Sequence, residues 1–385
     1  MELTLQQQRL RTEFRQFVDA HVVPGANAWD RQELMPPEVV RQLANHGYLG
    51  AVVPVSKGGA GFDSVEFGLL NEELGRGCSS LRSLLTVHSM VALTMSRWGT
   101  EDLKTQWLEK LGQGQAIGAF ALTEAEAGSD AREITTEAIE SGDDFVLTGH
   151  KKWITFGQTA DLFLVFARSR RGHCAFVVER NTPGLVTTPV HSMLGTRASM
   201  MAELRLEQCR VPKRNLVGAP GFGLSHIASS ALDCGRYSVA WGCVGIGQAC
   251  LESCLQYAGQ RKQSGVLLRE HQLIQRMITQ MVAGVKASRV LCCHAGQLRD
   301  AGDPASIIET SIAKYFACTT AAEIARDAVQ IHGANGCSSE YPVERFYRDA
   351  KIMEIIEGSN EIQEIAIAQS ACQAVAQAQS VAAAD

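Results

Sequence analysis

The chain of 385 residues lacks long hydrophobic runs and has no excess of basic residues. No apolar stretch reaches the roughly 18–20 residues that a membrane-spanning helix needs, which argues against an integral membrane protein. Lysine and arginine total 36 against 41 aspartate and glutamate residues, so the net charge is −5. Nucleic-acid binders concentrate positive charge on one face, and this balance argues against that class. The first 30 residues are rich in glutamine and mix acids with bases, unlike a signal peptide, so we expect a cytoplasmic enzyme.

Patterns for metal binding or disulfide formation are also missing, although the chain has 12 cysteines. None forms a C-x-x-C pair, and no cysteine–histidine cluster has the spacing of zinc ligands. The cysteines are scattered through apolar segments. We therefore expect small buried thiols in a reducing compartment and no metal site.

The periodicity of apolar residues divides the chain into three parts, for which the length is sufficient. Residues 1–116 have the 3.6-residue period of helices. Residues 117–222 alternate in short β-rich pieces separated by turn sequences, which predicts an antiparallel β domain of sandwich or barrel type. Residues 223–385 return to the helical period and predict a four-helix bundle. The expected helices of the bundle are 224–260, 271–300, 305–333 and 341–378. The predicted fold is therefore α+β, in the order helices, sheet, helices.

A candidate base lies near the end of the chain. Glu357 stands in the segment MEIIEGSNEIQ, residues 353–363, whose isoleucines indicate partial burial. Burial raises a carboxyl pKa toward the range that is useful for proton abstraction. Gly358 lets the backbone approach a ligand, and Ser359 with Asn360 can begin a new helix. From periodicity alone, a structural role for Glu357 at a helix junction is favoured over a catalytic one.

Several other segments reverse this preference when they are taken together. They are ALTEAEAGSD at 121–130, KWIT at 152–155, LGTRAS at 194–199, QIHGANG at 330–336 and RFYRDAK at 345–351. Each is weak alone. With the segment around Glu357, they follow the order of the acyl-CoA dehydrogenase family, and the chain resembles that family over nearly its whole length.

This resemblance implies a helical N-terminal domain, a middle β domain, a C-terminal four-helix bundle and FAD bound between them. Trp153 offers a flat face beside the flavin ring, and the hydroxyls of Thr123 and Thr155 suit hydrogen bonds to its heteroatoms. Ser129 and nearby backbone amides suit the pyrophosphate. Without the resemblance, Trp153 would more often be a core residue.

The family also forms its FAD site with a neighbouring subunit, so we expect a homodimer or homotetramer. By resemblance, Gln330 and Gly333 hold the adenosine end of the neighbour's FAD and Arg261 its pyrophosphate. The full set of FAD-binding residues that the resemblance implies is Phe120, Leu122, Thr123, Gly128, Ser129, Trp153, Thr155, Arg261, Gln272, Gln330, Gly333, Ser359 and Glu361.

The family's chemistry is oxidation of an acyl thioester. Its weakly acidic α-hydrogen leaves to a base while hydride passes from the β-carbon to flavin N5. By resemblance, Glu357 is the base and its backbone N–H helps to bind the thioester oxygen, while Arg236 lies near base and substrate. Some members place the base immediately before the arginine that is equivalent to Arg236. That position is Gly235 here, which leaves Glu357.

Five positions depart from the common family pattern. Ala125 and Glu126 stand where proline and glycine are usual, and Phe156 where asparagine or a small residue often follows Trp-Ile-Thr. Ser264 replaces a common phenylalanine, and Ala334 replaces a glycine after Gln330. The first two changes alter how the loop at 121–130 meets the flavin or the thioester arm, and Ser264 alters the cofactor contact near Arg261.

A finer resemblance concerns the substrate. The segments CSSLRS at 78–83, GRYSVAWGCVG at 235–245 and RDAKIMEIIEGS at 348–359 are similar to a branch that acts on acyl groups tethered to an acyl carrier protein. That branch makes hydroxymalonyl or methoxymalonyl extender units for polyketide and antibiotic biosynthesis from a glyceryl-type precursor. The substrate-binding residues that we expect from it are Ser80, Arg82, His88 and Gly358.

Arg82 gives this hypothesis a physical basis. An unpaired buried guanidinium is costly, so an arginine in the acyl pocket suits a hydroxyl, aldehyde hydrate or carboxylate on a short substrate. The structural alternative is that Arg82 pairs with Glu72 or Glu73. If the oxidised carbon carries a hydroxyl, the product is a carbonyl and not an enoyl group, and the sequence leaves this open.

Several functions compete with the carrier-linked enzyme. One is a catabolic short-chain acyl-CoA dehydrogenase that passes electrons to an electron-transfer flavoprotein. A second is a non-catalytic homologue, against which Glu357, Thr123, Trp153 and Arg236 argue. A third is an oxidase that uses oxygen. The basic cluster Arg168, Arg170 and Arg171 suits either CoA or a carrier protein, although such a run is usually only a solvated face.

Overall fold

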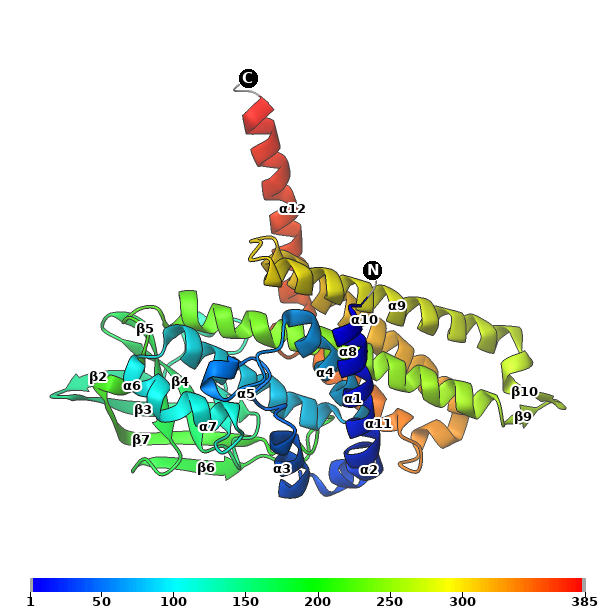
Figure 1. Ribbon diagram of the computed structural model, residues 1–385, viewed down its shortest axis with the longest axis horizontal. Coiled ribbons are helices and arrows are strands. Elements are labelled where there is room, and N and C mark those ends of the chain that lie inside the picture. The colour runs from blue at the N-terminus through cyan, green and yellow to red at the C-terminus, as the bar shows by residue number, and fades with distance from the viewer. Residues whose placement is uncertain (1–2, 383–385) are drawn as a thin grey trace. The chain divides into compact units, whose positions relative to one another are not determined.

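The computed structural model describes residues 3–382, which form two compact units (Figure 1). Unit 1 consists of Met1–Thr12, Ser64–Gly77 and Arg236–Asp385, and unit 2 of Glu13–Asp63 and Cys78–Gly235. Each unit is described by itself. The division does not follow the order of the chain, since one N-terminal helix belongs to the same unit as the C-terminal helices.

Unit 2 begins within helix α1 and continues in helices whose boundaries follow the prolines. The helix α1 spans Leu5–His21, of which Glu13 onward lies in this unit, and it buries Phe14, Phe17 and Val18. Proline occupies the first turn of the next two helices, where its missing N–H is not needed. The remaining helices of unit 2 are α2 (Val23–Gln32), α3 (Pro37–Asn45), α5 (Ser79–Trp98), α6 (Glu101–Leu103) and α7 (Glu109–Gly112).

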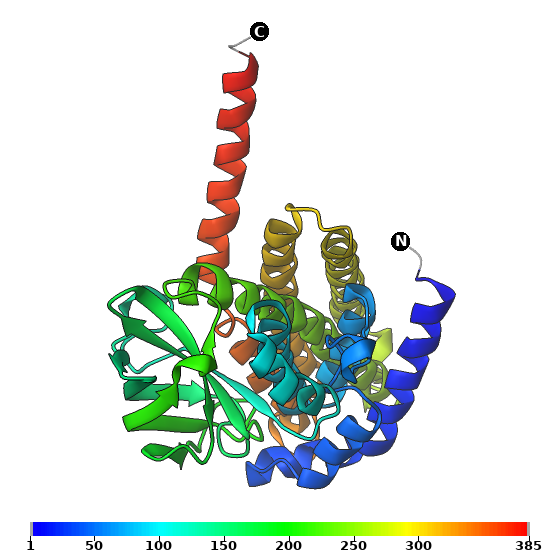
Figure 2. The ribbon, with the colours of Figure 1, turned by 60° about the vertical axis from the view of Figure 1, so that its left-hand side comes forward.

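The middle part of unit 2 is a sheet of eight strands within the described residues (Figure 2). The strands are β1 (Gly118–Ala121), β2 (Glu137–Ser141), β3 (Asp144–Ile154), β4 (Leu162–Ser169), β5 (Gly172–Glu179), β6 (Leu185–Pro189), β7 (Ala202–Pro212) and β8 (Leu216–Val217). Their order is β6-β7-β3-β2-β4-β5-β8, with β1 on β4. Most pairs are antiparallel as predicted, but both β1 and β2 run parallel to β4. The strand β1 enters directly from the helical segment, so it is not half of a hairpin.

The sheet curls over its own core. Phe145 of β3 and Phe176 of β5 are not on neighbouring strands, yet their ring centroids are 4.9 Å apart. The other face of β4, with Leu164 and Phe166, packs in one apolar cluster with Val91 of α5. Helices on one face and a curled sheet core on the other fit the predicted β domain of sandwich or barrel type.

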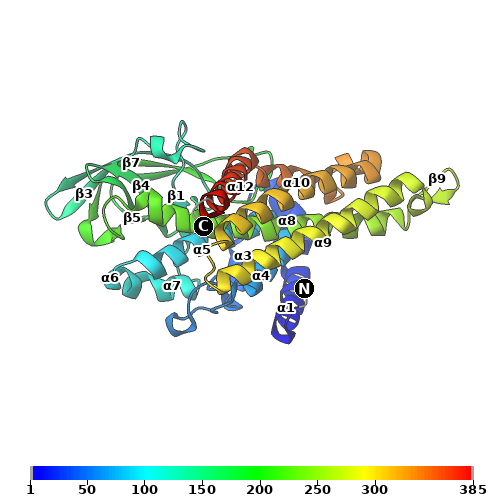
Figure 3. The same ribbon diagram turned by 90° about the horizontal axis from the view of Figure 1, so that it is seen from above.

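Unit 1 is a helical bundle. Its helices are α4 (Ser64–Gly77), α8 (Ser229–Ala258, of which Arg236 onward lies in this unit), α9 (Gln272–Asp300), α10 (Ser306–His332), α11 (Val343–Met353) and α12 (Asn360–Ala382). Figure 3 shows α9 and α10 side by side, with the short hairpin of β9 (Lys262–Gln263) and β10 (Val266–Leu267) at one end of α9. In Figure 1, α12 extends away from α9 and α10. The helical N-terminal part of the chain, the sheet and the helical C-terminal part together confirm the α+β fold class.

One predicted helix, 341–378, is broken in the structure. It is divided into α11 and α12 because Glu357 and Gly358 adopt positive φ angles of 56° and 90°. Left-handed residues of this kind cannot continue a right-handed helix. The break places Glu357 in a loop between two helices, which is the position that a structural role at a helix junction also predicts.

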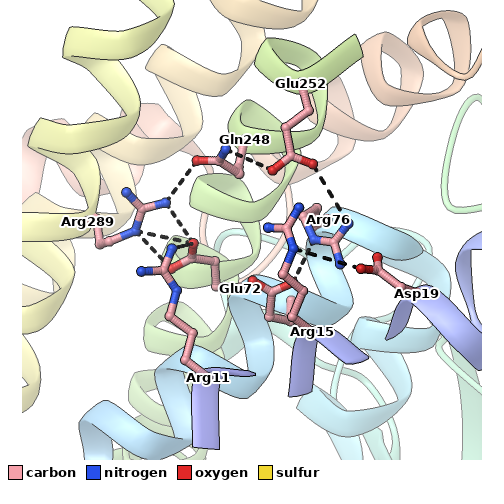
Figure 4. A network of polar contacts seen from close by, with 9 residues as sticks. Arg11, Arg15, Asp19, Glu72, Arg76, Gln248, Glu252 and Arg289 are labelled. Atoms are coloured by element: carbon pink, nitrogen blue, oxygen red, sulfur yellow. Dashed lines mark hydrogen bonds and ion pairs between the residues drawn. The ribbon is translucent and has the colours of Figure 1, made fainter. Parts of the chain in front are cut away.

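The helix α4 packs closely on α8 in unit 1 through a small residue, and a buried ionic network joins it to α9 and α1. A Cβ atom at Gly245 would lie 2.0 Å from the carbonyl oxygen of Glu72, so this approach requires glycine. The Glu72 carboxylate is buried and binds Arg289 of α9 at 2.7 Å and Arg11 of α1 at 3.5 Å (Figure 4). The neighbouring Glu73 binds Arg76 at 2.6 Å.

The fold tests the expectation that the cysteines are buried. Ten of the twelve cysteines are buried thiols, but Cys337 and Cys372 are exposed, so the expectation of burial is wrong for these two. Cys337 lies in the turn after α10 and Cys372 on the outward part of α12, where no other element covers them. Among residues 3–382, no helix is long and apolar enough to cross a membrane. In the same range, no group of three or more acidic, histidine or cysteine side chains is placed to hold a metal ion.

Candidate active site

A buried ion pair holds the loop that follows β1 in unit 2. The Lys151 ammonium donates to Glu124 Oε1 at 2.8 Å and to the Leu122 carbonyl at 3.0 Å. The backbone N–H and hydroxyl groups of Thr135 and Thr136 also donate to the Glu124 carboxylate, at up to 3.0 Å. Every oxygen of this carboxylate is therefore bonded, and the loop is tied to β3.

Both members of this pair are charged at pH 7. Burial opposes the charge on Glu124, but hydrogen bonds from Lys151 and Thr136, with the charge of Lys151, lower the pKa of the carboxyl to about 2. Burial lowers the pKa of Lys151 to about 8, while the hydrogen bond and charge of Glu124 oppose the shift. The pair thus remains ionic although both side chains are buried.

Trp153 projects from β3 beside this loop. Its φ angle is +62°, and the pairing of β3 with β7 shifts register between Lys151 and Ile154. Ile154 is buried and Lys152 is half-buried, and the corner turns the indole outward and leaves it 44% exposed. The core alternative for Trp153 is therefore wrong. The Lys152 backbone N–H donates to the Thr123 carbonyl at 2.9 Å, which brings the tryptophan strand and the loop together.

The predicted flavin-side residues are close to one another in unit 2 because β1, its loop and the end of β3 are neighbours. Thr123 and Thr155 are half-buried, and Gly128 and Ser129 are exposed. A Cβ atom at Gly128 would have no heavy atom within 4 Å, so there is open space above this backbone. Phe120 and Leu122 lie at the base of the loop, against the apolar cluster under the sheet. A flat exposed indole, free space over a glycine and exposed hydroxyls fit one side of a bound FAD.

The helix α5 in unit 2 carries three of the four predicted substrate residues, Ser80, Arg82 and His88. Arg82 is fully buried, and its Nη1 donates to the Thr86 hydroxyl at 2.8 Å. Ser80 is also buried, and its carbonyl accepts from the Ser83 hydroxyl at 2.6 Å. A fully buried guanidinium is rare, because a charge taken from water needs polar partners.

Both ring nitrogens of His88 are bonded to backbone groups. Its Nδ1 accepts from the Gly118 backbone N–H at 3.3 Å, and its Nε2 donates to the Leu111 carbonyl at 3.0 Å. Burial lowers its pKa to about 4, so the ring is neutral at pH 7. The ring nitrogens thus join α5 to β1 and to the end of α7, and the expected contact of His88 with substrate stays a prediction.

The loop between α11 and α12 in unit 1 carries Glu357, which is half-buried. The Arg236 guanidinium of α8 donates through Nε to the Glu357 carbonyl at 3.2 Å, across 121 residues of sequence. This contact is with the backbone of the candidate base. Arg236, expected to be catalytic, is thus seen here as a residue that holds the loop.

The rest of the loop is bonded to α10 and α12. The buried Lys314 ammonium of α10 donates to the Gly358 carbonyl at 2.9 Å. Gln363 Nε2 donates to the same carbonyl at 3.3 Å. Ser359 and Glu361, expected to contact FAD, follow in the chain, and a hydrogen bond from Ser359 lowers the pKa of the exposed Glu361 carboxyl.

The residues predicted for a neighbour's FAD gather at one end of the bundle in unit 1. Tyr257 of α8 stacks on His332 of α10 at a ring distance of 4.3 Å and accepts from Asn335 at 3.0 Å. Arg261 and Gln272 follow α8 and begin α9 at this end, and Gln330 and Gly333 end α10 there; all four are exposed. Gln330 lies 16 residues after Lys314 in α10, or roughly 24 Å along the axis, so this end is separate from the Glu357 loop.

Sequence reasoning missed Lys314 and Lys151. A signal for Lys314 existed, because it interrupts a small apolar stripe of α10 that includes Ala317, Cys318 and Ala321. A charge at helical spacing within a buried stripe indicates a bonded, specific role. The signal for Lys151 was weaker. Lys151 and Lys152 are adjacent in a strand, where side chains alternate between the two faces, so only one of the two can face inward.

Comparisons with known proteins bear on the identity of the chain. The acyl-CoA dehydrogenase N-terminal, middle and C-terminal domain models match residues 4–115, 119–209 and 223–372. The rat mitochondrial short-chain specific acyl-CoA dehydrogenase is 38% identical over 374 residues, covering 96% of this chain and 90% of that protein. A glutaryl-CoA dehydrogenase of Desulfococcus multivorans is 38% identical over 376 residues, covering 95% and 96%.

Two solved structures are similar to this chain in fold. FkbI, described as serving the biosynthesis of the methoxymalonyl extender unit of the Fk520 polyketide, has a TM-score of 0.87 and 34% identity, covering 94% of this chain and 99% of FkbI. The prolyl acyl carrier protein oxidase AnaB has a TM-score of 0.90 and 28% identity, covering 96% and 99%. The family models span the helical, β and helical parts in order, and the exposed flavin-side residues fit FAD, so the chain belongs to the acyl-CoA dehydrogenase family of FAD-dependent oxidoreductases.

Proposed function

We propose that this protein oxidises a short, polar acyl thioester carried on an acyl carrier protein, in the formation of an extender unit for polyketide biosynthesis. The observation that carries the proposal is the likeness of the chain to FkbI and to the prolyl acyl carrier protein oxidase AnaB over nearly its whole length. Arg82 on α5 agrees with this choice, because a guanidinium can donate charge-assisted hydrogen bonds to a carboxylate or hydroxyl of the substrate, and a plain fatty-acyl chain has no such acceptor.

Each proposed role follows from a chemical property of the residue. Glu357 removes the α-proton of the thioester, and its backbone N–H donates to the thioester oxygen as negative charge develops there. FAD, when bound, accepts the hydride from the β-carbon. Arg236 orients the Glu357 segment through the carbonyl contact, and Gly358 leaves room for the acyl chain. Trp153, Thr123 and Thr155 hold the flavin side.

Assembly and electron transfer are part of the proposal. The exposed position of Arg261, Gln330 and Gly333, roughly 24 Å along α10 from the Glu357 loop, supports their use by a neighbouring subunit in a homodimer or homotetramer. The electron acceptor is an electron-transfer flavoprotein or oxygen. The basic cluster of Arg168, Arg170 and Arg171 adds little support to the carrier hypothesis. Arg168 and Arg171 already form ion pairs with Glu137 and Glu140, with nitrogen–oxygen distances of 3.6 and 3.8 Å.

A second candidate function is that of a catabolic short-chain acyl-CoA dehydrogenase acting on CoA thioesters. It is favoured by the 38% identity to the rat short-chain enzyme over nearly all of both chains. The glutaryl-CoA dehydrogenase relative combines one feature of each candidate function, because its name specifies a polar, carboxylated acyl group that is carried on CoA. Carrier and acyl group must therefore be tested independently.

The test is anaerobic bleaching of the flavin absorbance of the purified holoenzyme. Butyryl, glutaryl and glyceryl-derived groups would each be presented on CoA and on an acyl carrier protein. We expect rapid bleaching only with the polar groups on the carrier protein. Rapid bleaching by butyryl-CoA would instead establish the catabolic function.

Arg82→Leu separates recognition of the acyl group from recognition of the carrier. It should slow bleaching by polar substrates at least roughly tenfold and spare butyryl thioesters, because it removes one charge-assisted hydrogen bond. Arg97→Leu, an exposed arginine on the same helix, is the matched control. Equal losses on polar and plain substrates would return Arg82 to a structural role.

A further inference from the structure

The Glu357 loop has a conformation that its own sequence does not stabilise. Glu357 has a φ angle of +56° and is followed by Gly358 at +90°. A left-handed glutamate is disfavoured by contact between its Cβ and the backbone, and it persists only where surrounding groups hold it. The direction of the Glu357 side chain depends on these two backbone conformations.

Two cationic side chains bind two consecutive carbonyl groups of this loop. Arg236 of α8 donates to the Glu357 carbonyl at 3.2 Å, and Lys314 of α10 donates to the Gly358 carbonyl at 2.9 Å. A bound carbonyl oxygen fixes the plane of its peptide group. The planes after Glu357 and after Gly358 are therefore both fixed from outside the loop, by different helices.

Lys314 is itself held firmly in place. Its side chain is fully buried, and its ammonium also donates to Asn360 Oδ1 at 3.1 Å. The Asn360 amide in turn donates to Thr319 of α10 at 3.3 Å, and the Asn360 backbone N–H donates to the Glu354 carbonyl at 2.9 Å. Thus Lys314 and Asn360 tie both ends of the loop to one helix.

The chemistry of these partners is unusual for a buried lysine. In the described residues, no carboxylate oxygen lies within the 4.0 Å of an ion pair from Lys314 Nζ, and its acceptors are a backbone carbonyl and an amide oxygen. A buried ammonium is costly unless polar partners compensate it, and the Gly358 carbonyl and the Asn360 amide oxygen do so here, with a contribution from the charge of the exposed Glu361. The positive charge of Lys314 is therefore explained by the two groups that it binds, the Gly358 carbonyl and the Asn360 side chain.

We propose that Lys314 is a positioning residue that sets the orientation of Glu357 by binding the Gly358 carbonyl and Asn360. This inference rests on the proposed role of Glu357 as the base. Lys314 acts through the loop and does not touch the substrate.

The test compares four variants of the holoenzyme by two measurements. Hydrogen–deuterium exchange of residues 354–363 reports the loop directly, and anaerobic flavin reduction reports the chemistry. Lys314→Met removes the donor, Lys314→Arg keeps a cationic donor, and Asn360→Ala removes the second acceptor. Lys351→Met is the matched control, because Lys351 is an exposed lysine of α11 that binds the Glu354 side chain at 3.0 Å.

We expect Lys314→Met to exchange roughly tenfold faster in residues 354–363 and to reduce flavin at least roughly tenfold more slowly, with FAD content and KM unchanged. Asn360→Ala should change both in the same direction, and it replaces Lys314→Met if that variant does not fold. Lys314→Arg should restore most of the rate, and Lys351→Met should match the wild type.

The outcomes are distinguishable from failure of the proposed function. Unchanged exchange in both Lys314→Met and Asn360→Ala, or faster exchange with an unchanged reduction rate, would overturn the inference. If no thioester reduces the wild-type flavin, the proposed function fails. In that case the exchange data still decide whether Lys314 holds the loop.

Discussion

Two regions of the molecule each rely on a buried lysine, but they use it differently. On the flavin side in unit 2, Lys151 pairs with the carboxylate of Glu124 at 2.8 Å. On the base side in unit 1, Lys314 binds only neutral oxygens, of Gly358 and Asn360. The first lysine joins a loop to a strand through an ion pair, and the second joins a loop to a helix through dipoles.

The two lysines therefore differ in which groups would lose a partner if the ammonium were removed. Without Lys151, a buried carboxylate loses its counter-charge, which is a large stability cost. Without Lys314, a carbonyl and an amide lose one hydrogen bond each, which costs less stability but releases the geometry of the candidate base. We therefore expect the flavin-side lysine to govern folding and cofactor binding, and the base-side lysine to govern rate.

The largest expected effect is on the base itself. Glu357→Gln keeps the shape of the side chain but removes the proton acceptor, so flavin reduction should fall roughly 10²- to 10⁴-fold while FAD remains bound. Stopped-flow absorbance under anaerobic conditions measures this rate, and the flavin-to-protein ratio is the control. Substantial residual reduction would reject Glu357 as the base.

Lys151→Met should have the next largest effect. Leaving the Glu124 carboxylate buried without its cation should lower the free energy of unfolding by about 3–5 kcal/mol, and Lys314→Met should lower it by only about 1–3 kcal/mol. Urea denaturation measures both values. The double variant Lys151→Met with Glu124→Leu should recover part of the loss. If the two single lysine variants were equally stable, the contrast between the two regions would be wrong.

The smallest expected effect is the pH dependence of the Glu124 pair. The pKa of this carboxyl is about 2 in the folded protein against an ordinary 4.5, so the folded state favours the ionised form. The stabilisation is complete above about pH 4.5 and is lost as the pH falls toward 2. Urea midpoints measured across this range should therefore fall more steeply for the wild type than for Glu124→Gln. Equal slopes would show that Glu124 does not contribute.

Much of the fold was predictable because its signals are local. Pro37 begins a helix as expected, and the alternating residues around Phe145, Phe163 and Phe176 form strands. Pro24 was expected only to end the first helix, and it also lies in the first turn of α2. The parallel pairing of β1 with β4 was not predicted, since pairing partners are chosen by burial of the whole sheet and not by either strand. The expected domain boundaries at 116/117 and 222/223 remain a prediction, because the two compact units divide the chain in a different way.

Less of the candidate site was predictable. Trp153 and Glu357 were found because they occur in recognisable segments, but their positive φ angles were not, because neither residue type favours that conformation. His88 was assigned to the substrate because of its place on α5, and its two hydrogen bonds to backbone groups were not predicted.

The sequence by itself determined the family, the helix–sheet–helix order and the identity of the candidate base, since these depend on local periodicity and on motifs in register. Only the tertiary structure decided which charges hold the two loops. Lys151 lies 27 residues from Glu124, and Lys314 lies 44 residues from Gly358. The energy of a buried charge is set by the atoms that surround it after folding, and these come from segments far apart in the chain.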